Sequence, residues 1–379
     1  MVTLRINAQE IKQMARAAFP IHAAIYMPIL KWRQGEYQGL TRLHPSIKDR
    51  VVPLFEIPTE AWDFETESPA KTLDEHLAPF GQRLETKWED RLCLIDSPYV
   101  DDDATLADGT HHIAFAIGSA IEVGANPIPV TGLRRSRAYQ QAIRTIVRRH
   151  STPVAIRLSP EDFSVDLPTN LANLLELLAT PRGNCHLVLD VRAGIADSPD
   201  TQALIWITLL NQLPDAAEWS GVTVAGTAFP AELSAAYFRP QGRVTRGEWA
   251  AYQTLLTRRG PQIRIPSFGD YGVSHPDTEA IDPRLIDPTA KIKYTTPNDW
   301  IVFVGQQVKR YGRAQYQGLA LAVTQSSDYA GPTYSWGDEY IYECAHNGGS
   351  TGGTSTWPSV GTNHHVSLVV NQLASFHGV

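Results

Sequence analysis

The sequence predicts an α/β fold, a TIM-like (β/α)8 barrel with a helix before it and a smaller α+β extension after it. Two observations predict the barrel. Short apolar segments alternate with helical segments along most of the chain, and these apolar segments are nearly continuous, as strands covered on both faces require. Eight such repeats over roughly 250 residues match a closed barrel of parallel strands.

The predicted strands are the apolar segments that end in a polar residue. They span residues 24–30, 51–57, 91–95, 127–131, 153–158, 186–191, 222–226 and 262–266. The helices predicted between them span 35–43, 73–86, 112–124, 136–150, 168–179, 201–213 and 231–259, the last with a break at Pro240. An open doubly wound sheet is the alternative, and it fits less well because no strand is followed by a GxGxxG turn.

The chain divides into three parts. Residues 1–20 show helical spacing of apolar residues interrupted by charges, which predicts an amphipathic helix. Residues 21–275 form the predicted barrel. A proline-rich linker then opens the extension, residues 276–379, with strands expected at 291–294 and 300–304 and helices at 315–326 and 363–376. We expect this extension to pack over the barrel mouth.

Bulk composition excludes several classes of protein. The net charge of -7 argues against general nucleic-acid binding, and the arginine-rich segment 134–149 is the one local exception, better explained as an exposed helix face. No apolar run approaches the ~18 residues of a membrane span. The 3 cysteines form no CxxC motif, so no zinc or redox motif is present and a cytoplasmic location is expected.

Polar residues at the carboxyl ends of barrel strands converge on one mouth, where barrel enzymes place their active sites. The carboxylates at these ends are Glu56, Asp96 and Asp190, the catalytic candidates. They could hold Mg²⁺ or divide acid and base roles. The cations are Lys31, Arg157 and Arg192, which could bind a phosphate. Structural ion pairs around the rim are the competing interpretation.

Two further segments lie near this predicted mouth. Asp270 and Tyr271 stand between two glycines after the eighth strand, where barrels bind phosphate through backbone N–H groups; an ordinary turn would have the same composition. His111 and His112 precede a helix. Adjacent histidines seldom ligate one ion, so capping or solvent exposure is the favoured interpretation.

The extension carries two dense polar and aromatic clusters. The residues predicted to bind ligand and to close the mouth are Trp336, Asp338, Glu339, His364 and His365. Thr362 or Asn363 could cap the last helix. Ser335 with His364 and Asp338 would make a hydrolase triad, yet the sequence has no GxSxG nucleophile elbow. Alternatively, Trp336, Tyr340 and Trp357 would anchor a partner protein.

Several of these motifs together resemble one known family. The motifs are Tyr26-Met27-Pro28-Ile29-Leu30-Lys31-Trp32 with Gly35-Glu36, Val52-Pro53-Leu54-Phe55-Glu56-Ile57, Ser335-Trp336-Gly337-Asp338-Glu339, and Trp357 with Asn363-His364-His365. From about residue 20 onward, the sequence resembles the beta protein family, named for a protein of T-even bacteriophage. The resemblance implies the domain layout, implicates both tail clusters and suggests a link to phage–host conflict. It implies no reaction.

The leading functional hypothesis is a barrel-mouth site for a phosphorylated small molecule or nucleotide, with divalent-metal-dependent hydrolysis of a phosphate ester as its catalytic form. The alternative is a non-catalytic binding protein, a sensor or effector in phage defence, that recognises its partner through the barrel and the aromatic tail. Neither the metal nor the oligomeric state follows from the sequence.

Overall fold

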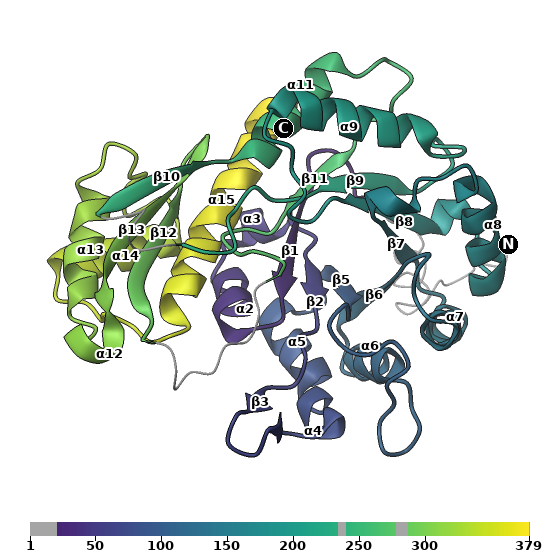
Figure 1. The fold of residues 1–379 in the computed structure, drawn as a ribbon, viewed down its shortest axis with the longest axis horizontal. Coiled ribbons are helices and arrows are strands. Elements are labelled where there is room, and N and C mark those ends of the chain that lie inside the picture. Colours follow the sequence, from purple (N-terminus) through teal and green to yellow (C-terminus); the bar gives the residue numbers. More distant parts are fainter. Residues whose placement is uncertain (1–20, 234–239, 278–286, 379) are drawn as a thin grey trace, which may run out of the picture.

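A computed structural model describes residues 21–233, 240–277 and 287–378. Its centre is a closed barrel of parallel strands in the order β1-β11-β9-β8-β7-β6-β5-β2. Helices surround the barrel, and a small sheet with further helices lies beside it (Figure 1). The predicted (β/α)8 barrel is confirmed. The helix expected within residues 1–20 lies outside the described residues.

The barrel strands are short and buried on both faces. They are β1 (Tyr26–Lys31), β2 (Leu54–Glu56), β5 (Leu92–Asp96), β6 (Asn126–Thr131), β7 (Val154–Leu158), β8 (Cys185–Asp190), β9 (Gly221–Ala225) and β11 (Ser267–Asp270). Side chains alternate along each strand. In β1, Met27 and Ile29 fill the barrel interior, whereas Tyr26 and Leu30 pack under the helices.

The outer layer consists of helices that follow the strands. They are α2 (Gln34–Thr41), α3 (Pro45–Lys48), α4 (Leu73–Leu77), α5 (Phe80–Trp88), α6 (His112–Glu122), α7 (Arg137–His150), α8 (Leu167–Leu178), α9 (Pro199–Gln212) and α11 (Gly247–Arg258). Short 3-10 helices lie at Pro160–Asp162 and Arg182–Asn184, and a ribbon pairs β3 (Trp62–Asp63) with β4 (Ser68–Pro69). The single helix predicted at 73–86 is two helices, because Pro79 has no N–H to continue the first.

Two expectations near the end of the barrel are wrong. The eighth strand is β11, after the predicted segment 262–266. The sequence of β11 is too polar to be recognised as a buried strand. Ser267 is buried because its hydroxyl hydrogen-bonds that of Thr223 inside the sheet. Position 269 requires glycine, because a Cβ there would lie 2.8 Å from a backbone oxygen of β1. Part of the helix predicted at 231–259 is instead strand β10 (Gln241–Thr245), which pairs with a strand of the extension.

The extension is built on a three-stranded antiparallel sheet. The predicted ribbon is confirmed as β12 (Thr289–Thr295) and β13 (Asp299–Gln307), and β10 is the third strand. Four helices follow: α12 (Val308–Tyr311), α13 (Gln315–Thr324), α14 (Trp336–His346) and α15 (Thr356–His377). Thr362 and Asn363 lie inside α15 rather than capping it, because the helix starts just before Pro358, a residue tolerated in a first turn.

Helix α15 joins the extension to the barrel, and we call its contacts with α2, α14, β1 and β12 the α15 seam. It lies beside α2 in Figure 1. Glycines allow the close approach: a Cβ at Gly35 would lie 2.7 Å from Pro358, and one at Gly39 would lie 2.8 Å from the Ser359 carbonyl oxygen. Within the described residues, no helix is both long and apolar enough to cross a membrane.

Candidate functional site at the barrel mouth

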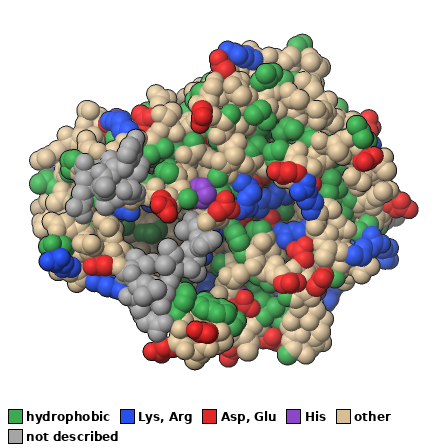
Figure 2. Space-filling model, in the orientation of Figure 1, with side chains coloured by type: hydrophobic (Ala, Val, Ile, Leu, Met, Phe, Trp, Pro, Cys, Tyr) green, Lys and Arg blue, Asp and Glu red, His purple; other side chains and the backbone are tan. Residues whose placement is uncertain are grey.

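Arg157, near the end of β7, gathers the three predicted carboxylates. Its Nη1 donates to Glu56 Oε1 at 2.8 Å and to Asp96 Oδ2 at 2.7 Å. Its Nε and Nη2 donate to Asp190 Oδ2 at 3.0 and 2.6 Å. Nη2 also reaches the Tyr271 hydroxyl at 2.7 Å. We call these five residues the Arg157 network. The strand ends therefore converge as expected, and Figure 2 shows acidic and basic side chains gathered over the barrel.

Surrounding residues complete the hydrogen bonding of these carboxylates. Tyr99 donates its hydroxyl proton to Glu56 Oε2 at 2.9 Å, and Arg135 donates to Asp96. Burial alone would raise the pKa of Asp96, but Arg135 and Arg157 outweigh it and the pKa falls below its usual range. Burial would equally lower the pKa of Arg157, and its anionic neighbours raise it well above normal. The network is therefore a set of charged, mutually satisfied groups.

A pocket of about 390 Å³ lies above this network. Its charged lining is Arg134, Arg135, Arg157, Arg192, Asp96, Asp102, Asp162 and Asp190. Two of the arginines reach solvent: the Arg192 side chain is 36% exposed and pairs with Asp277, and the Arg134 side chain is 61% exposed and pairs with Asp162. The rim thus offers arginine N–H groups to a ligand, whereas Arg157 is occupied by carboxylates.

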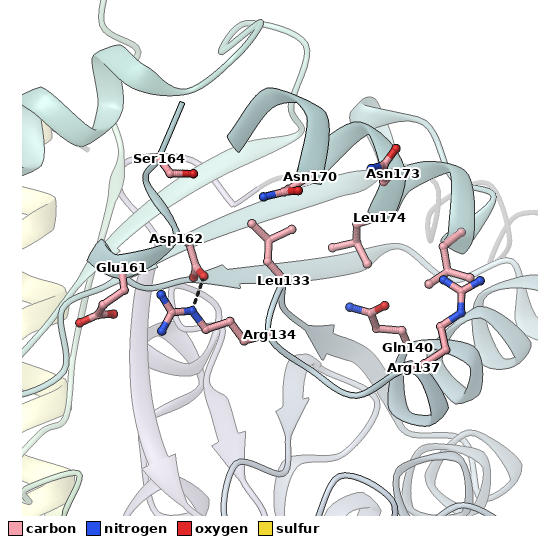
Figure 3. Close-up of a pocket in the computed structure, with 11 residues that line it drawn as sticks. Leu133, Arg134, Arg137, Gln140, Glu161, Asp162, Ser164, Asn170, Asn173 and Leu174 are labelled. Carbon is pink, nitrogen blue, oxygen red and sulfur yellow. Dashed lines mark hydrogen bonds and ion pairs between the residues drawn. The ribbon is translucent and has the colours of Figure 1, made fainter. Parts of the chain in front are cut away.

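A second hollow of about 370 Å³ continues outward from the mouth. It shares Arg134 and Asp162 with the mouth pocket. Figure 3 shows it between residues of α7, such as Gln140, and of α8, such as Asn170, with the Arg134–Asp162 pair on its wall. A ligand longer than the mouth pocket could extend along this polar channel.

Lys31 lies at the end of β1 but does not join the Arg157 network. Its Nζ is 3.5 Å from the His275 carbonyl oxygen and 5.0 Å from the centre of the Tyr99 ring. Burial, followed by repulsion from Arg33, lowers its pKa. The three predicted cations therefore differ in place: Arg157 in the floor, Arg192 on the rim and Lys31 to one side.

Magnesium does not fit these carboxylates. The guanidinium group of Arg157 already lies between Glu56, Asp96 and Asp190, where a shared divalent cation would have to bind. Throughout the described ranges, no group of three His, Cys, Asp or Glu side chains is arranged to hold a metal ion. Arg157 supplies the positive charge that balances these carboxylates.

Asp270 and Tyr271 point in opposite directions, because neighbouring side chains alternate along a strand. Tyr271 faces the mouth, where its hydroxyl donates to Asp190 Oδ2 at 2.6 Å. Asp270 faces α15: it accepts from the Tyr26 hydroxyl and lies 3.0 Å from His365 Nε2. All three of these outward groups are fully buried. His365 therefore ties α15 to the barrel wall.

His364 belongs to another buried cluster on the same helix. Its Nδ1 is 2.8 Å from Asp338 Oδ2 and its Nε2 is 2.7 Å from the Thr295 carbonyl oxygen. Ser335 donates its hydroxyl proton to Asp338 at 2.6 Å. Since both ring nitrogens of His364 have other partners, Ser335 has no general base and the geometry is not that of a hydrolase triad. Ser335 instead caps α14, accepting from the Asp338 N–H.

The remaining tail residues also lie at the α15 seam. Trp336 stacks on Arg42, with the guanidinium carbon 4.4 Å from the ring centre, and Glu339 is exposed beside it. Asn363 bridges three helices: its Nδ2 donates to the Gly39 carbonyl and its Oδ1 accepts from the Gly337 N–H, both at 2.9 Å. Trp357 is buried. Trp336 and Asn363 thus join the extension to the barrel, whereas Trp357 packs against Tyr316 inside the extension.

The first residues of the extension contact the mouth. The Tyr99 hydroxyl oxygen lies 2.8 Å from the Pro276 carbonyl oxygen, and Asp277 pairs with Arg192. Helices α13, α14 and α15 lie to the side of the barrel (Figure 1). Residues 278–286 lie outside the described part of the chain.

Three residues of the mouth were not predicted from the sequence. Tyr99 comes from the loop after β5, and Arg134 and Arg135 come from the loop after β6. The residues a few positions past each strand are the place to look for them, since loops at the carboxyl ends of strands form the mouth of a barrel.

The strand order and the position of the mouth define a (β/α)8 barrel protein with a candidate site at the carboxyl ends of its strands. The profile of the Beta protein family matches residues 26–371, and the chain belongs to this family. No curated protein matches the chain.

Two solved structures resemble the chain weakly. Triosephosphate isomerase from Bartonella henselae has 12% identity and a TM-score of 0.33, covering 64% of this chain and 91% of that one. The carboxyl transferase domain of Rhizobium etli pyruvate carboxylase has 12% identity and a TM-score of 0.37, covering 71% of this chain and 43% of that one.

Proposed function

We propose that the protein binds a phosphorylated small molecule or nucleotide at the barrel mouth. The observation that carries the proposal is the pocket of about 390 Å³ at the carboxyl ends of the strands, with Arg134 and Arg192 exposed on its rim. Its volume falls in the range of roughly 300–1,000 Å³ typical of small-molecule sites. Arginine presents a planar set of donors that suits phosphate oxygens.

The Arg157 network would serve as a rigid floor for this ligand. Its side chains are locked by mutual hydrogen bonds, so ligand binding need not order them, and ordering flexible groups lowers affinity. Asp277 is 59% exposed, so exchange of this partner of Arg192 for a phosphate would free no buried charge. Asp162, the partner of Arg134, is buried, but it keeps the hydrogen bonds that it accepts from the Ser159 N–H and hydroxyl. Arg192 can therefore change partner at low cost.

Binding without turnover is the form of the proposal that the geometry favours. Glu56, Asp96 and Asp190 all accept hydrogen bonds from the Arg157 guanidinium group. This pairing favours their ionised form, so none has a proton to donate as a general acid. A sensor or effector in phage defence, suggested by the family resemblance, needs occupancy of the site rather than hydrolysis. A cytoplasmic place of action is part of the proposal and is supported by three free, buried cysteines.

Titration calorimetry with AMP, ribose 5-phosphate and inorganic phosphate tests the proposal. Arg192→Gln should weaken binding of the tightest probe by roughly tenfold or more, the equivalent of one charge-assisted hydrogen bond. Arg258→Gln is the matched control, since Arg258 forms a similarly exposed ion pair with Asp200 on the helix layer. Equal affinities for the wild type and Arg192→Gln would refute the proposal, as would the absence of binding at millimolar concentration. Release of phosphate from a probe would show hydrolysis instead.

A further inference from the structure

A larger cavity of about 590 Å³ lies at the α15 seam. Its walls come from the loop after β1, the loop after β11, the strand β12 and the glycine-rich segment before α15. It is distinct from the mouth pocket, with which it shares no lining residue. A hollow is visible left of the barrel mouth in Figure 2. We call this cavity the seam pocket.

Four cations line the seam pocket: Arg33, Lys291, Lys293 and Arg313. Lys291 and Lys293 lie two residues apart on β12, so both side chains point to the same face. The residues between and beside them, Ala290, Ile292 and Tyr294, are buried in the core of the extension. The alternation of the strand therefore places two amines side by side in the cavity.

Three of these cations donate to backbone carbonyl groups. Lys291 donates to the Leu233 carbonyl at 2.6 Å, Lys293 to the Val273 carbonyl at 2.7 Å, and Arg313 to the Gly352 carbonyl at 3.0 Å. None of the four forms an ion pair with an acidic side chain of the described residues, in a chain whose net charge is -7. Glu36 is the one acidic lining residue. Among the described residues, four cations thus face one carboxylate around this cavity, which leaves a net positive field.

The free-energy cost of this arrangement favours an anionic occupant. Burial lowers the pKa of Lys293 to about 8, which means that the surroundings disfavour its charged form. A bound anion would offset this cost by stabilising the charged form. The N-termini of α2 and α15 both border the cavity, and their partial positive charges act in the same direction. Tyr316 and Trp357, stacked 4.7 Å apart, form an apolar wall.

We propose that the seam pocket binds a polyphosphate-bearing nucleotide, with Arg33, Lys291, Lys293 and Arg313 holding the phosphates and Tyr316 and Trp357 lining the side of the base. The site is separate from the barrel mouth. Arg33 belongs to the barrel, and the other three cations belong to the extension. A ligand in the seam pocket therefore contacts both parts of the chain at once.

Titration calorimetry with ATP, inorganic triphosphate and adenosine tests the site in the full chain. ATP should bind the Arg192→Gln variant, in which the mouth is impaired, and triphosphate should bind more weakly than ATP, while adenosine should not bind. Arg33→Gln and Arg313→Gln should each reduce ATP affinity by about tenfold. Arg33 is exposed, so its substitution should leave the fold intact, which the thermal midpoint checks. Arg310→Gln, on the exposed helix α12 outside the pocket, is the matched control.

The outcomes separate this site from the mouth. If Arg192→Gln abolishes ATP binding and Arg33→Gln and Arg313→Gln do not affect it, the seam pocket is refuted and the mouth proposal stands. If Arg33→Gln and Arg313→Gln weaken ATP binding and Arg192→Gln changes nothing for any probe, the seam pocket stands and the mouth proposal falls. No binding of ATP or triphosphate to the wild type at millimolar concentration, or an equal loss in Arg310→Gln, would overturn the seam proposal.

Discussion

Removal of Arg157 should destabilise the barrel strongly and in a pH-dependent way. Its guanidinium group is the shared partner of Glu56, Asp96 and Asp190, whose side chains are 0–2% exposed. Arg157→Met keeps the packing of the stem and removes the charge. Breaking a buried ion pair from one side costs about 3–5 kcal/mol, because the remaining charge is left uncompensated in the interior. Because three carboxylates are left close together, we expect the free energy of unfolding at pH 7 to fall by this amount or more.

Lower pH should restore part of that stability. Three adjacent carboxylates without a cation repel one another, so at least one should have a raised pKa and take up a proton near pH 5. Urea unfolding of the wild type and Arg157→Met at pH 7 and pH 5 measures the difference, in which the effects of all other groups cancel. Arg258→Gln, which breaks an exposed pair, should cost less than about 1 kcal/mol at both values. A loss for Arg157→Met below 1 kcal/mol, or one independent of pH, would refute the reasoning.

Two further predictions concern packing and pH. Gly39→Ala should destabilise the protein by about 1–3 kcal/mol in urea unfolding, since its Cβ would meet the Ser359 carbonyl. Gly118→Ala, with open space around it in α6, should stabilise by about 0.5–1 kcal/mol; equal effects would contradict the close approach of α2 and α15. Burial lowers the pKa of His112 to about 4, so below pH 6.5 the unfolded state binds the proton first and stability falls as pH drops. This loss should reach about 2 kcal/mol at pH 5 and be absent in His112→Gln; parallel pH profiles of the two proteins would disprove it.

The sequence predicted the barrel because the signal is local. Each strand is a short apolar run, and the polar residue that ends it marks the mouth, as Glu56, Asp96 and Asp190 show. The strand β11 was not predicted because its sequence, Ser-Phe-Gly-Asp, has the composition of a turn. Its side chains are buried by neighbours that are far away in the sequence.

The partners of the site residues could not be predicted. Asp270 and Tyr271 are neighbours, and only the register of β11 decides that one faces α15 and the other the mouth. The same limit applies to the tail. Asp338, His364 and His365 have the chemistry of a catalytic site, but tertiary packing pairs them with buried groups of β12 and the barrel wall.

The seam pocket was missed for a related reason. Lys291 and Lys293 have the spacing of two residues on one face of a strand, which the sequence shows. Arg33 is brought to them by the packing of α15 on α2, and Arg313 by the packing of α13 on β12. Residues that lie far apart in the chain gave no sign that they share a cavity.

The structure of a crystal soaked with the phosphorylated probe that binds most tightly tests the mouth proposal most directly. We predict density for the phosphate group within hydrogen-bonding distance of the Arg192 and Arg134 guanidinium groups, with the Arg157 network unchanged beneath it. Phosphate density confined to other surfaces, with only water over the Arg157 network, would contradict the proposal.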